Sequence, residues 1–474
     1  MAITRLAAPA TFNPAYNINA YYYDSTNKNQ TGFSYVVDIY EAGTSTKIYE
    51  GRIAPRPNDG YGYFNLTKTL TSQLSLDLPI GNATFRQATT NFVRYDVKIG
   101  EEYVISYTID TPVDDSGYLK LDTTAVNTFA VGDQVVITGA DVASVNGLHT
   151  IIDVTDTDTF TIDLVYDAGM ASLTTGSITY ADNRKTITRD LNTLSGQVAY
   201  DAAIAPVPYT EWDANDWNMD STSDPRGKFL TSAPDNFYVA ESVEAHFMMY
   251  SSNTSTYCAR VYYKNSNGDV AYRSTANAGW YVMSVPVGTA NLNPTTATVG
   301  TLPIIKDDTE WYQVWMTNGS GTRTSDIFTF YIDRRCTAND YNILFKDRMG
   351  SWLPFSFGLL STENKQINRS AYKKSYGDYD GVSAFTYDTT ARGNAIFNVD
   401  ETTSLTLNTN WMNDEASVYF KELMTSPECY LLVDGNYLAV TVNETSHEVK
   451  RERNKKMIRY TVSVTMSIND PING

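Results

Sequence analysis

Histidines are the side chains best suited to acid–base chemistry near neutral pH, and this chain has three of them. His149, His246 and His447 lie in three separate segments of the 474 residues. The sequence after His447 lacks the second histidine of a helical zinc motif, and the chain contains neither a Gly-x-Ser-x-Gly elbow nor a Walker loop. We therefore expect structural histidines, with no metal, no cofactor and no catalytic residue.

Acidic residues are abundant, but they form no pattern specific for a cation or for hydrolysis. The segment 378–381, Asp-Tyr-Asp-Gly, has the beginning of a calcium loop without its distal glutamate, so a turn is the better interpretation. The aspartates within 153–158 lie between two predicted strands, where solvated turn acids are the ordinary case. A glycosidase needs two carboxylates about 5–10 Å apart in a cleft. Because no pair stands out, a hydrolase is the least favoured function.

Two tryptophans, Trp212 and Trp217, stand beside several acids in a loop-rich segment. Two indole rings beside carboxylates suit sugar binding, and the 35 tyrosines of the chain suit a recognition surface. The alternative is that both indole rings fill a junction between domains. A glycan- or receptor-binding surface is therefore a second function that the sequence leaves open.

The composition is typical of many short strands, and it predicts a mainly β, multidomain fold with one or two short helices. Thr, Ser, Asn and Tyr are frequent, and turn dipeptides recur along the chain. The alternation of Phe33, Tyr35, Val37 and Ile39 predicts one such strand. The clearest helical pattern covers 413–424, where acids fill the first turn and a proline follows the end.

The length predicts two to four domains, and the strand pattern divides the chain into four parts. An N-terminal β domain is expected over 1–112 and 183–227. The segment 113–182 forms an inserted small β-barrel. The segment 228–335 has the short, regular strand spacing of an immunoglobulin-like β-sandwich, and 336–474 forms a C-terminal β domain with the helix.

The predicted insert, 113–182, contains a recognisable pattern of strands and turns. Strands are predicted over 128–137, 145–152 and 157–164, the first entered by a Val-Gly-Asp turn and the second containing an Asn-Gly hairpin signal. The pattern resembles the small β-barrel inserts that are found in many phage particle proteins.

The net charge of −18 argues against binding nucleic acid through its phosphates. A negative surface provides solubility, and it would also let DNA slide past without sticking. The basic segment 450–456 interrupts this pattern. We interpret it as a solvated hairpin turn, the alternative being a docking patch for an acidic neighbour.

Cysteine usage and the N-terminal sequence predict where the protein is made. Cys258, Cys336 and Cys429 form no disulfide framework and no zinc spacing, which favours synthesis in a reducing compartment. The first residues lack the apolar run of a signal peptide, and no stretch has the length of a membrane span.

Two segments are predicted to dock against a partner. The block 327–357 contains two strands, a turn at Gly350 and large apolar anchors that need a packed neighbour. The segment 7–20 is expected to be extended because of its prolines, as an arm along a neighbour or a frayed terminus. The candidate subunit contacts are Phe12, Pro14, Tyr16, Arg348, Trp352, Phe355 and Phe357.

The order of several motifs resembles virion proteins of tailed phages that infect Bacteroidota, including crAss-like phages. The main one is the run from Phe328 through Cys336 to Phe357, in which this chain has Asp347 for Asn, Ser351 for a second Gly and Leu353 after the tryptophan. Further matches are Lys228–Pro234, Phe12–Tyr16 and Met424–Leu432.

This resemblance implies a non-enzymatic structural protein of the bacteriophage tail, such as a tail ring, collar or adaptor subunit around the DNA exit path. The implied partners are copies of itself in a homo-oligomeric ring and other virion proteins, including portal, tail and neighbouring ring proteins. Neither specific nucleic-acid recognition nor membrane contact is expected. The protein would be made in the host cytoplasm without a signal peptide and reside in the virion.

Overall fold

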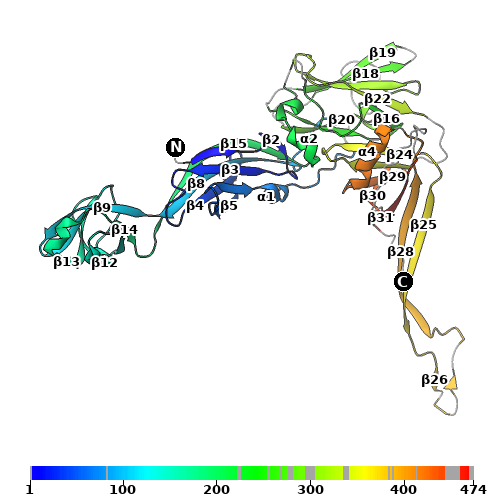
Figure 1. The fold of residues 1–474 in the computed structure, drawn as a ribbon. Helices are drawn as coiled ribbons and strands as arrows, with labels where there is room; N and C mark the ends of the chain where they lie inside the picture. The colour runs from blue at the N-terminus through cyan, green and yellow to red at the C-terminus, as the bar shows by residue number, and fades with distance from the viewer. Residues whose placement is uncertain are drawn as a thin grey trace. The chain divides into compact units, whose positions relative to one another are not determined.

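The computed structural model is mainly β, as the composition predicts (Figure 1). It describes residues 3–81, 84–220, 222, 226–252, 257–265, 268–275, 281–293, 305–334, 341–379, 381–382, 385–386, 389–412, 414–443 and 459–468. These residues form two compact units. Unit 1 contains 1–13, 18–72 and 93–199; unit 2 contains 14–17, 73–92 and 200–474.

Unit 1 is built on two small sheets. One has the strand order β1 (Ile3–Ala7), β3 (Ala20–Ser25), β6 (Gly62–Asn65); the other has the order β2 (Phe12–Pro14), β15 (Lys185–Tyr200), β8 (Phe92–Val104), β4 (Ser34–Glu41), β5 (Lys47–Ile53). β4 forms where the alternation predicts a strand, but its burial does not alternate, because Val36 and Asp38 are buried as well as Tyr35, Val37 and Ile39. A single helical turn, α1 (Thr67–Thr71), follows β6.

Unit 1 also contains a closed six-stranded barrel. Its order is β10 (Tyr118–Thr123), β13 (Thr159–Val165), β12 (Gly147–Val154), β11 (Gln134–Thr138), β14 (Ser177–Tyr180), β9 (Ser106–Asp115). Two 3₁₀ turns, Ala143–Val145 and Ala168–Ser172, connect its strands. Inward-facing side chains such as Leu121, Phe129 and Phe160 form its core. The chain enters the barrel after β8 and leaves it before β15, and these two strands are neighbours in the five-stranded sheet.

Unit 2 packs two sheets around one hydrophobic core. The five-stranded sheet has the order β16 (Asn236–Ala240), β22 (Phe328–Asp333), β21 (Trp311–Asn318), β18 (Tyr257–Asn265), β19 (Gly268–Thr275). The ten-stranded sheet has the order β25 (Thr362–Lys373), β28 (Asn394–Asn408), β31 (Thr461–Met466), β30 (Asn436–Val442), β29 (Cys429–Val433), β23 (Tyr341–Lys346), β24 (Trp352–Phe357), β17 (His246–Tyr250), β20 (Val282–Pro286), β7 (Arg86–Gln87). The larger sheet thus joins strands from 228–335 to strands from 336–474.

Helices are short in unit 2 apart from α4 (Asp414–Thr425), which forms where the sequence predicts a helix. It packs Tyr419, Phe420 and Leu423 into the core between the sheets. The other helical turns among the described residues of unit 2 are α2 (Pro206–Thr210), α3 (Thr289–Leu292) and the 3₁₀ turn Ala214–Trp217.

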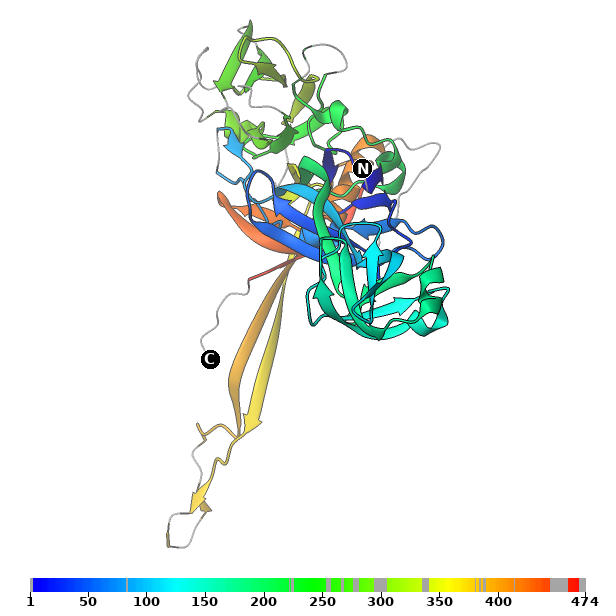
Figure 2. The same cartoon turned by 90° about the vertical axis from the view of Figure 1, so that its left-hand side faces the viewer.

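The ten-stranded sheet extends into a long two-stranded ribbon. β25 and β28 pair antiparallel from Thr362↔Thr406 to Lys373↔Asn394. They run side by side, away from the other strands, in both views (Figures 1 and 2). Beyond them lie the short strands β26 (Asp378–Tyr379) and β27 (Phe385–Thr386). We call the part from Lys365 to Lys373, with its partners from Asn394 to Thr403, the free ribbon.

Candidate functional site

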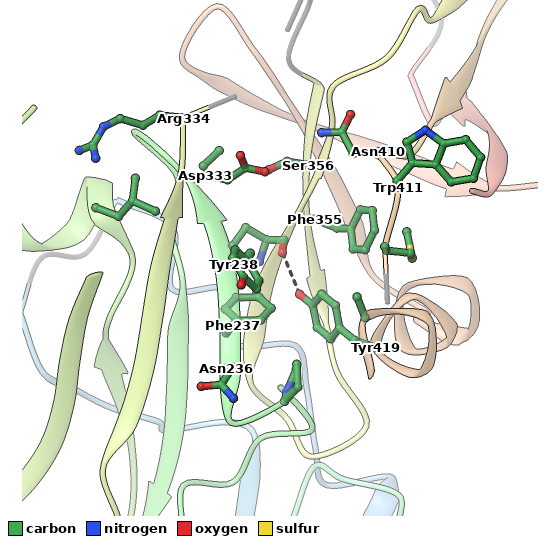
Figure 3. Close-up of a pocket in the computed structure, with 16 residues that line it drawn as sticks. Asn236, Phe237, Tyr238, Asp333, Arg334, Phe355, Ser356, Asn410, Trp411 and Tyr419 are labelled. Carbon is green, nitrogen blue, oxygen red and sulfur yellow. Dashed lines mark hydrogen bonds between the residues drawn. The ribbon is translucent and has the colours of Figure 1, made fainter. Parts of the chain in front are cut away.

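A groove of about 570 Å³ opens in unit 2 between β16, β24 and the start of α4 (Figure 3). Its lining is mostly apolar and aromatic. The lining residues are Pro234, Asn236, Phe237, Tyr238, Ala240, Ile332, Asp333, Arg334, Pro354, Phe355, Ser356, Asn410, Trp411, Met412, Ala416 and Tyr419. We call it the aromatic groove.

The floor of the aromatic groove is held rigidly by ring contacts. Tyr419 of α4 meets Phe237 edge-on, with ring centroids 4.9 Å apart, and stacks on Phe355 at 5.8 Å. Its hydroxyl donates a hydrogen bond to the carbonyl oxygen of Pro354 at 2.8 Å (Figure 3). Burial, together with the negative charges of Asp347 and Glu422, raises the pKa of Tyr419 well above its usual value. The hydroxyl therefore remains a neutral donor.

The rim of the aromatic groove exposes two large rings. Trp411 is 52% exposed and Tyr238 is 62% exposed. Tyr238 stacks on Tyr331 of the adjacent strand at 5.4 Å, and the guanidinium of Arg459 lies 5.7 Å from the Trp411 ring. Exposed rings that are fixed by their own neighbours form a preorganised contact surface.

The apolar and aromatic lining of the aromatic groove suits recognition. Among its described lining residues Asp333 is the one carboxylate, whereas most glycosidases use a pair. Arg334 is the one cation among them, and its guanidinium binds Glu241 and the carbonyl oxygens of Thr309 and Lys306. The polar groups left at the rim include the amides of Asn236 and Asn410.

A second polar centre lies at the turn between β23 and β24, where Asp347 is buried. Its Oδ1 accepts hydrogen bonds from the backbone N–H groups of Met349 (3.0 Å) and Ser351 (2.7 Å). Its Oδ2 accepts from the backbone N–H and the hydroxyl of Ser232, at 2.7 and 3.0 Å, and from the hydroxyl of Thr231 at 3.2 Å. Asp347 thus ties this turn to the segment before β16.

Burial raises the pKa of Asp347 to about 7, and the charge of Glu422 adds to the rise, while the hydrogen bonds from Ser232 and Ser351 oppose it. Arg348 forms a two-point ion pair with Glu422, with N–O distances of 2.6 and 2.7 Å. Lys346 pairs with Asp201. Lys346, Asp347 and Arg348 of the predicted block are therefore held by partners within unit 2.

The aromatic anchors of the same block pack inside the chain. Trp352 and Phe357 are at most 1% exposed, and Phe355 is 8% exposed at the groove. The indole N–H of Trp352 donates to the carbonyl oxygen of Asp77 at 3.1 Å. These anchors pack against neighbours within unit 2. Their contact with another subunit stays a prediction, and the buried side chains offer little exposed surface for it.

The predicted contact residues near the N-terminus differ in how exposed their side chains are. Phe12 and Pro14 are buried, whereas Tyr16 is 55% exposed. Tyr16 and the partly exposed Arg348 are the predicted contact residues that present accessible side-chain surface.

The two tryptophans that suited a sugar site contact each other. The rings of Trp212 and Trp217 stack with centroids 5.3 Å apart, and Tyr200 stacks on Trp212 at 6.4 Å. The ammonium of Lys228 lies 6.0 Å from the Trp217 ring. Much of the ring surface that a sugar would need is thus taken up by the chain itself.

The described histidines have structural environments. His246 is fully buried, and its Nε2 lies 3.2 Å from Glu244 and 3.3 Å from the amide of Asn291. Burial lowers its pKa, which Glu244 partly opposes. The Nε2 of His149 lies 2.9 Å from the carbonyl oxygen of Val145.

Neither a metal cluster nor a membrane helix is found in the described part of the chain. No three His, Cys, Asp or Glu side chains there are placed to share a metal ion. No helix there is long and apolar enough to cross a membrane. His447, Cys336, Asp380 and the basic segment 450–456 lie outside the described residues.

Comparisons with known proteins return little. No family model and no curated protein matches the chain. Two solved structures have low similarity to this chain. The endosialidase of phage phi92 has a TM-score of 0.16 and 11% identity, and the match covers 99% of this chain and 70% of that chain. Trypsin-activated alpha-2-macroglobulin from Escherichia coli has a TM-score of 0.13 and 9% identity, and the match covers 99% of this chain and 40% of that chain. TM-scores this low do not indicate a shared fold, and neither structure informs the function.

Proposed function

We propose that this chain is a structural subunit of a tailed-phage virion. It assembles with copies of itself into a ring, collar or adaptor around the DNA exit path, in contact with neighbouring virion proteins. The resemblance of the run Phe328–Phe357 to virion proteins motivates the class, and the free ribbon is the observation that carries the role in assembly.

The free ribbon supports a role in assembly because packing against its own chain does little to stabilise it. All twelve residues of β25 are exposed, so neither face of this strand contributes to a core of its own chain. An isolated two-stranded ribbon is at best marginally stable in water. A long exposed edge also invites unwanted strand pairing unless a partner covers it. A subunit that keeps such an element gains from it when another molecule packs against it.

The charge of the chain fits a position beside DNA. An excess of acids gives a net charge of −18, which repels phosphates. In a ring, an acidic inner wall would let DNA pass without being held.

Light scattering of the intact chain at physiological salt, alone and with neighbouring virion proteins, tests the proposal. A mass of several chains, or a stable complex with a virion protein, supports it. A strict monomer that binds no virion protein would overturn it.

A second candidate function is glycan or receptor binding at the particle surface. The exposed rings of Trp411 and Tyr238, beside the amides of Asn236 and Asn410, favour the aromatic groove over the Trp212–Trp217 pair. A glycan array read with the wild type, Trp411→Ala and the double variant Trp212→Ala/Trp217→Ala separates the two sites. Saturable binding that Trp411→Ala abolishes would establish this function, and no saturable binding would exclude it for the glycans on the array.

A further inference from the structure

Among the described residues, no third strand pairs with the free ribbon. β31 pairs with β28 over Ser404–Asn408, and these pairings end where the free ribbon begins. From Lys365 to Lys373 the ladder of described residues consists of β25 and β28. At about 3.4 Å per residue, it projects about 27 Å beyond the sheet.

The far end of the free ribbon carries an exposed aromatic pair. Tyr372 is 50% exposed and Phe397 is 62% exposed, and their ring centroids lie 6.1 Å apart. The register passes from Ser370↔Asn398 to Ala371↔Ile396, so Phe397 is the extra residue of a β-bulge. Bulges often redirect one side chain, and here the bulge places a phenylalanine beside Tyr372 in solvent. Two large rings in this position are a contact surface without a cover.

The aromatic groove offers the matching surface on the same chain. Its floor contains Phe237, Phe355 and Tyr419, and its rim exposes Trp411 and Tyr238. Aromatic pairs gain about 0.5–1.5 kcal/mol beyond the burial of their area. An aromatic wedge and an aromatic-lined groove are therefore chemically complementary.

A ribbon cannot reach the groove of its own chain while its ladder is intact. The groove residue Trp411 follows the end of β28 at Asn408. From Phe397 to Asn408 the strand covers about 37 Å. The connection from Asn408 to Trp411 recovers at most about 11 Å of that distance. The remaining gap of roughly 26 Å exceeds the reach of two side chains, so the contact requires two molecules.

We propose that the Tyr372–Phe397 end of the free ribbon inserts into the aromatic groove of a second copy of this chain. This inference rests on the proposed function and names the contact that builds the assembly. Such a contact joins two different surfaces, is heterologous, and closes into a ring when the rotation between copies permits.

Charge and area agree with a second copy as the partner. The free ribbon carries Lys365, Arg369 and Lys373 on β25 and Asp400 and Glu401 on β28, which is a net charge of +1, and Lys365 pairs with Glu401 at 2.8 Å. The chain as a whole has a net charge of −18, so the free ribbon has the opposite sign of charge to a second copy. With the neighbour also covering both faces of the free ribbon behind the inserted end, each about 27 Å long and about 10 Å wide, the contact would cover roughly 500 Å². This approaches the ~800 Å² per partner of a standard interface.

Photo-cross-linking between labelled copies tests this contact. Benzoylphenylalanine replaces Phe397 in the intact chain, and the same group at Tyr118, an exposed position of the barrel, is the control. Equal amounts of ¹⁴N and ¹⁵N protein are mixed and irradiated. We expect mixed-isotope cross-links from position 397 to peptides that contain Trp411 or Tyr238, and none of these from position 118. Cross-links within one copy, at another surface of a second copy, or none at all would overturn the inference.

A short-ribbon variant separates this inference from the proposed function. It replaces 366–402 with Asn-Gly between the register partners Lys365 and Thr403. All seven tryptophans lie in unit 2, so their fluorescence reports whether the variant folds. Wild-type unfolding together with loss of assembly supports the inference. Retained assembly overturns the inference and leaves the proposed function standing, whereas an intact chain that never assembles and binds no virion protein overturns both.

Point variants decide the case in which the short-ribbon variant does not fold. Phe397→Ser and Trp411→Ser change exposed side chains on the two sides of the contact. Each is expected to weaken assembly by about tenfold or more, as for a central aromatic in an interface. Leu360→Ser, at an exposed residue outside the free ribbon and the groove, is the matched control. Assembly unchanged in both test variants would overturn the contact.

Discussion

Replacing Asp347 with asparagine should remove a pH-dependent part of the stability of unit 2. The pKa of this buried carboxyl is raised from an ordinary value of 3.8 to about 7 in the folded chain. Between these values the native state holds a proton that the unfolded state has released. Stability changes with pH in proportion to the protons bound by the unfolded state minus those bound by the native state, so it falls as the pH rises.

The size of the effect follows from the shift. One pKa unit corresponds to about 1.36 kcal/mol. From about pH 5 to pH 7 the carboxyl is mostly protonated in the native state and ionised in the unfolded state. The free energy of unfolding therefore decreases by about 3 kcal/mol between pH 5 and pH 8. The amide of the Asp347→Asn variant stays neutral and keeps a carbonyl oxygen for the N–H groups of Met349 and Ser351. The free energy of unfolding of wild type minus variant should therefore fall by about 3 kcal/mol over this range.

Urea unfolding followed by tryptophan fluorescence is the assay, because every tryptophan lies in unit 2 with Asp347. Asp307→Asn, at an exposed aspartate of the same unit, measures the part of any change that comes from net charge alone. Glu422→Gln removes a charge that raises the pKa of Asp347, so it should move the transition to lower pH. A wild-type-minus-Asp347→Asn difference that is constant from about pH 5 to pH 8 would refute this reasoning.

Three further substitutions in unit 2 have expected outcomes in the same urea assay. Trp352→Ala should lose about 3–5 kcal/mol, because the ring is buried and its N–H binds Asp77; a loss below about 1 kcal/mol would contradict this. Gly288→Ala should lose about 1–3 kcal/mol, since a Cβ there would lie 2.6 Å from the backbone oxygen of Val243; unchanged unfolding would show that the backbone yields easily. Arg348→Ala should lose about 1–3 kcal/mol, because the mostly buried Glu422 is left without its partner; a neutral result would mean that water replaces the guanidinium.

Local patterns predicted the mainly β class because strand alternation is a property of neighbouring residues. β4 forms where Tyr35, Val37 and Ile39 predict a strand, and α4 forms where acids and a proline mark its ends. The barrel strands β12 and β13 form close to the predicted 145–152 and 157–164, whereas of 128–137 only the end is a strand, β11. Asn146-Gly147 is not a hairpin turn, because Gly147 already pairs with Ile137 and a 3₁₀ turn lies before it. Each of these signals is read within about ten residues.

Pairings between distant segments could not be predicted in this way. β7 (Arg86–Gln87) pairs with β20 near residue 283, and β17 pairs with both β20 and β24. No local pattern therefore indicates that 228–335 and 336–474 share a ten-stranded sheet. Trp352 shows the same limit, because a large apolar ring signals the need for a packed neighbour without saying whether that neighbour belongs to the same chain.

The candidate site was missed for a related reason. The aromatic groove collects Phe237, Phe355, Trp411 and Tyr419 from four segments that tertiary pairing alone brings together. The sequence of the free ribbon carries a weaker signal. Two long polar runs flank the segment 378–381, and we interpreted that segment alone as a turn. An apolar alternation was absent from β25 because none of its side chains enters the core of this chain.

The proposed function depends on closed assembly of this chain with copies of itself. Electron microscopy of the intact protein at physiological salt is the sharpest test, because it shows particle shape and symmetry without a partner being named. We predict closed rings with one rotational symmetry, in which the ribbon of each copy meets the next copy. Single unassembled chains at every concentration, or open filaments without closure, would contradict this prediction.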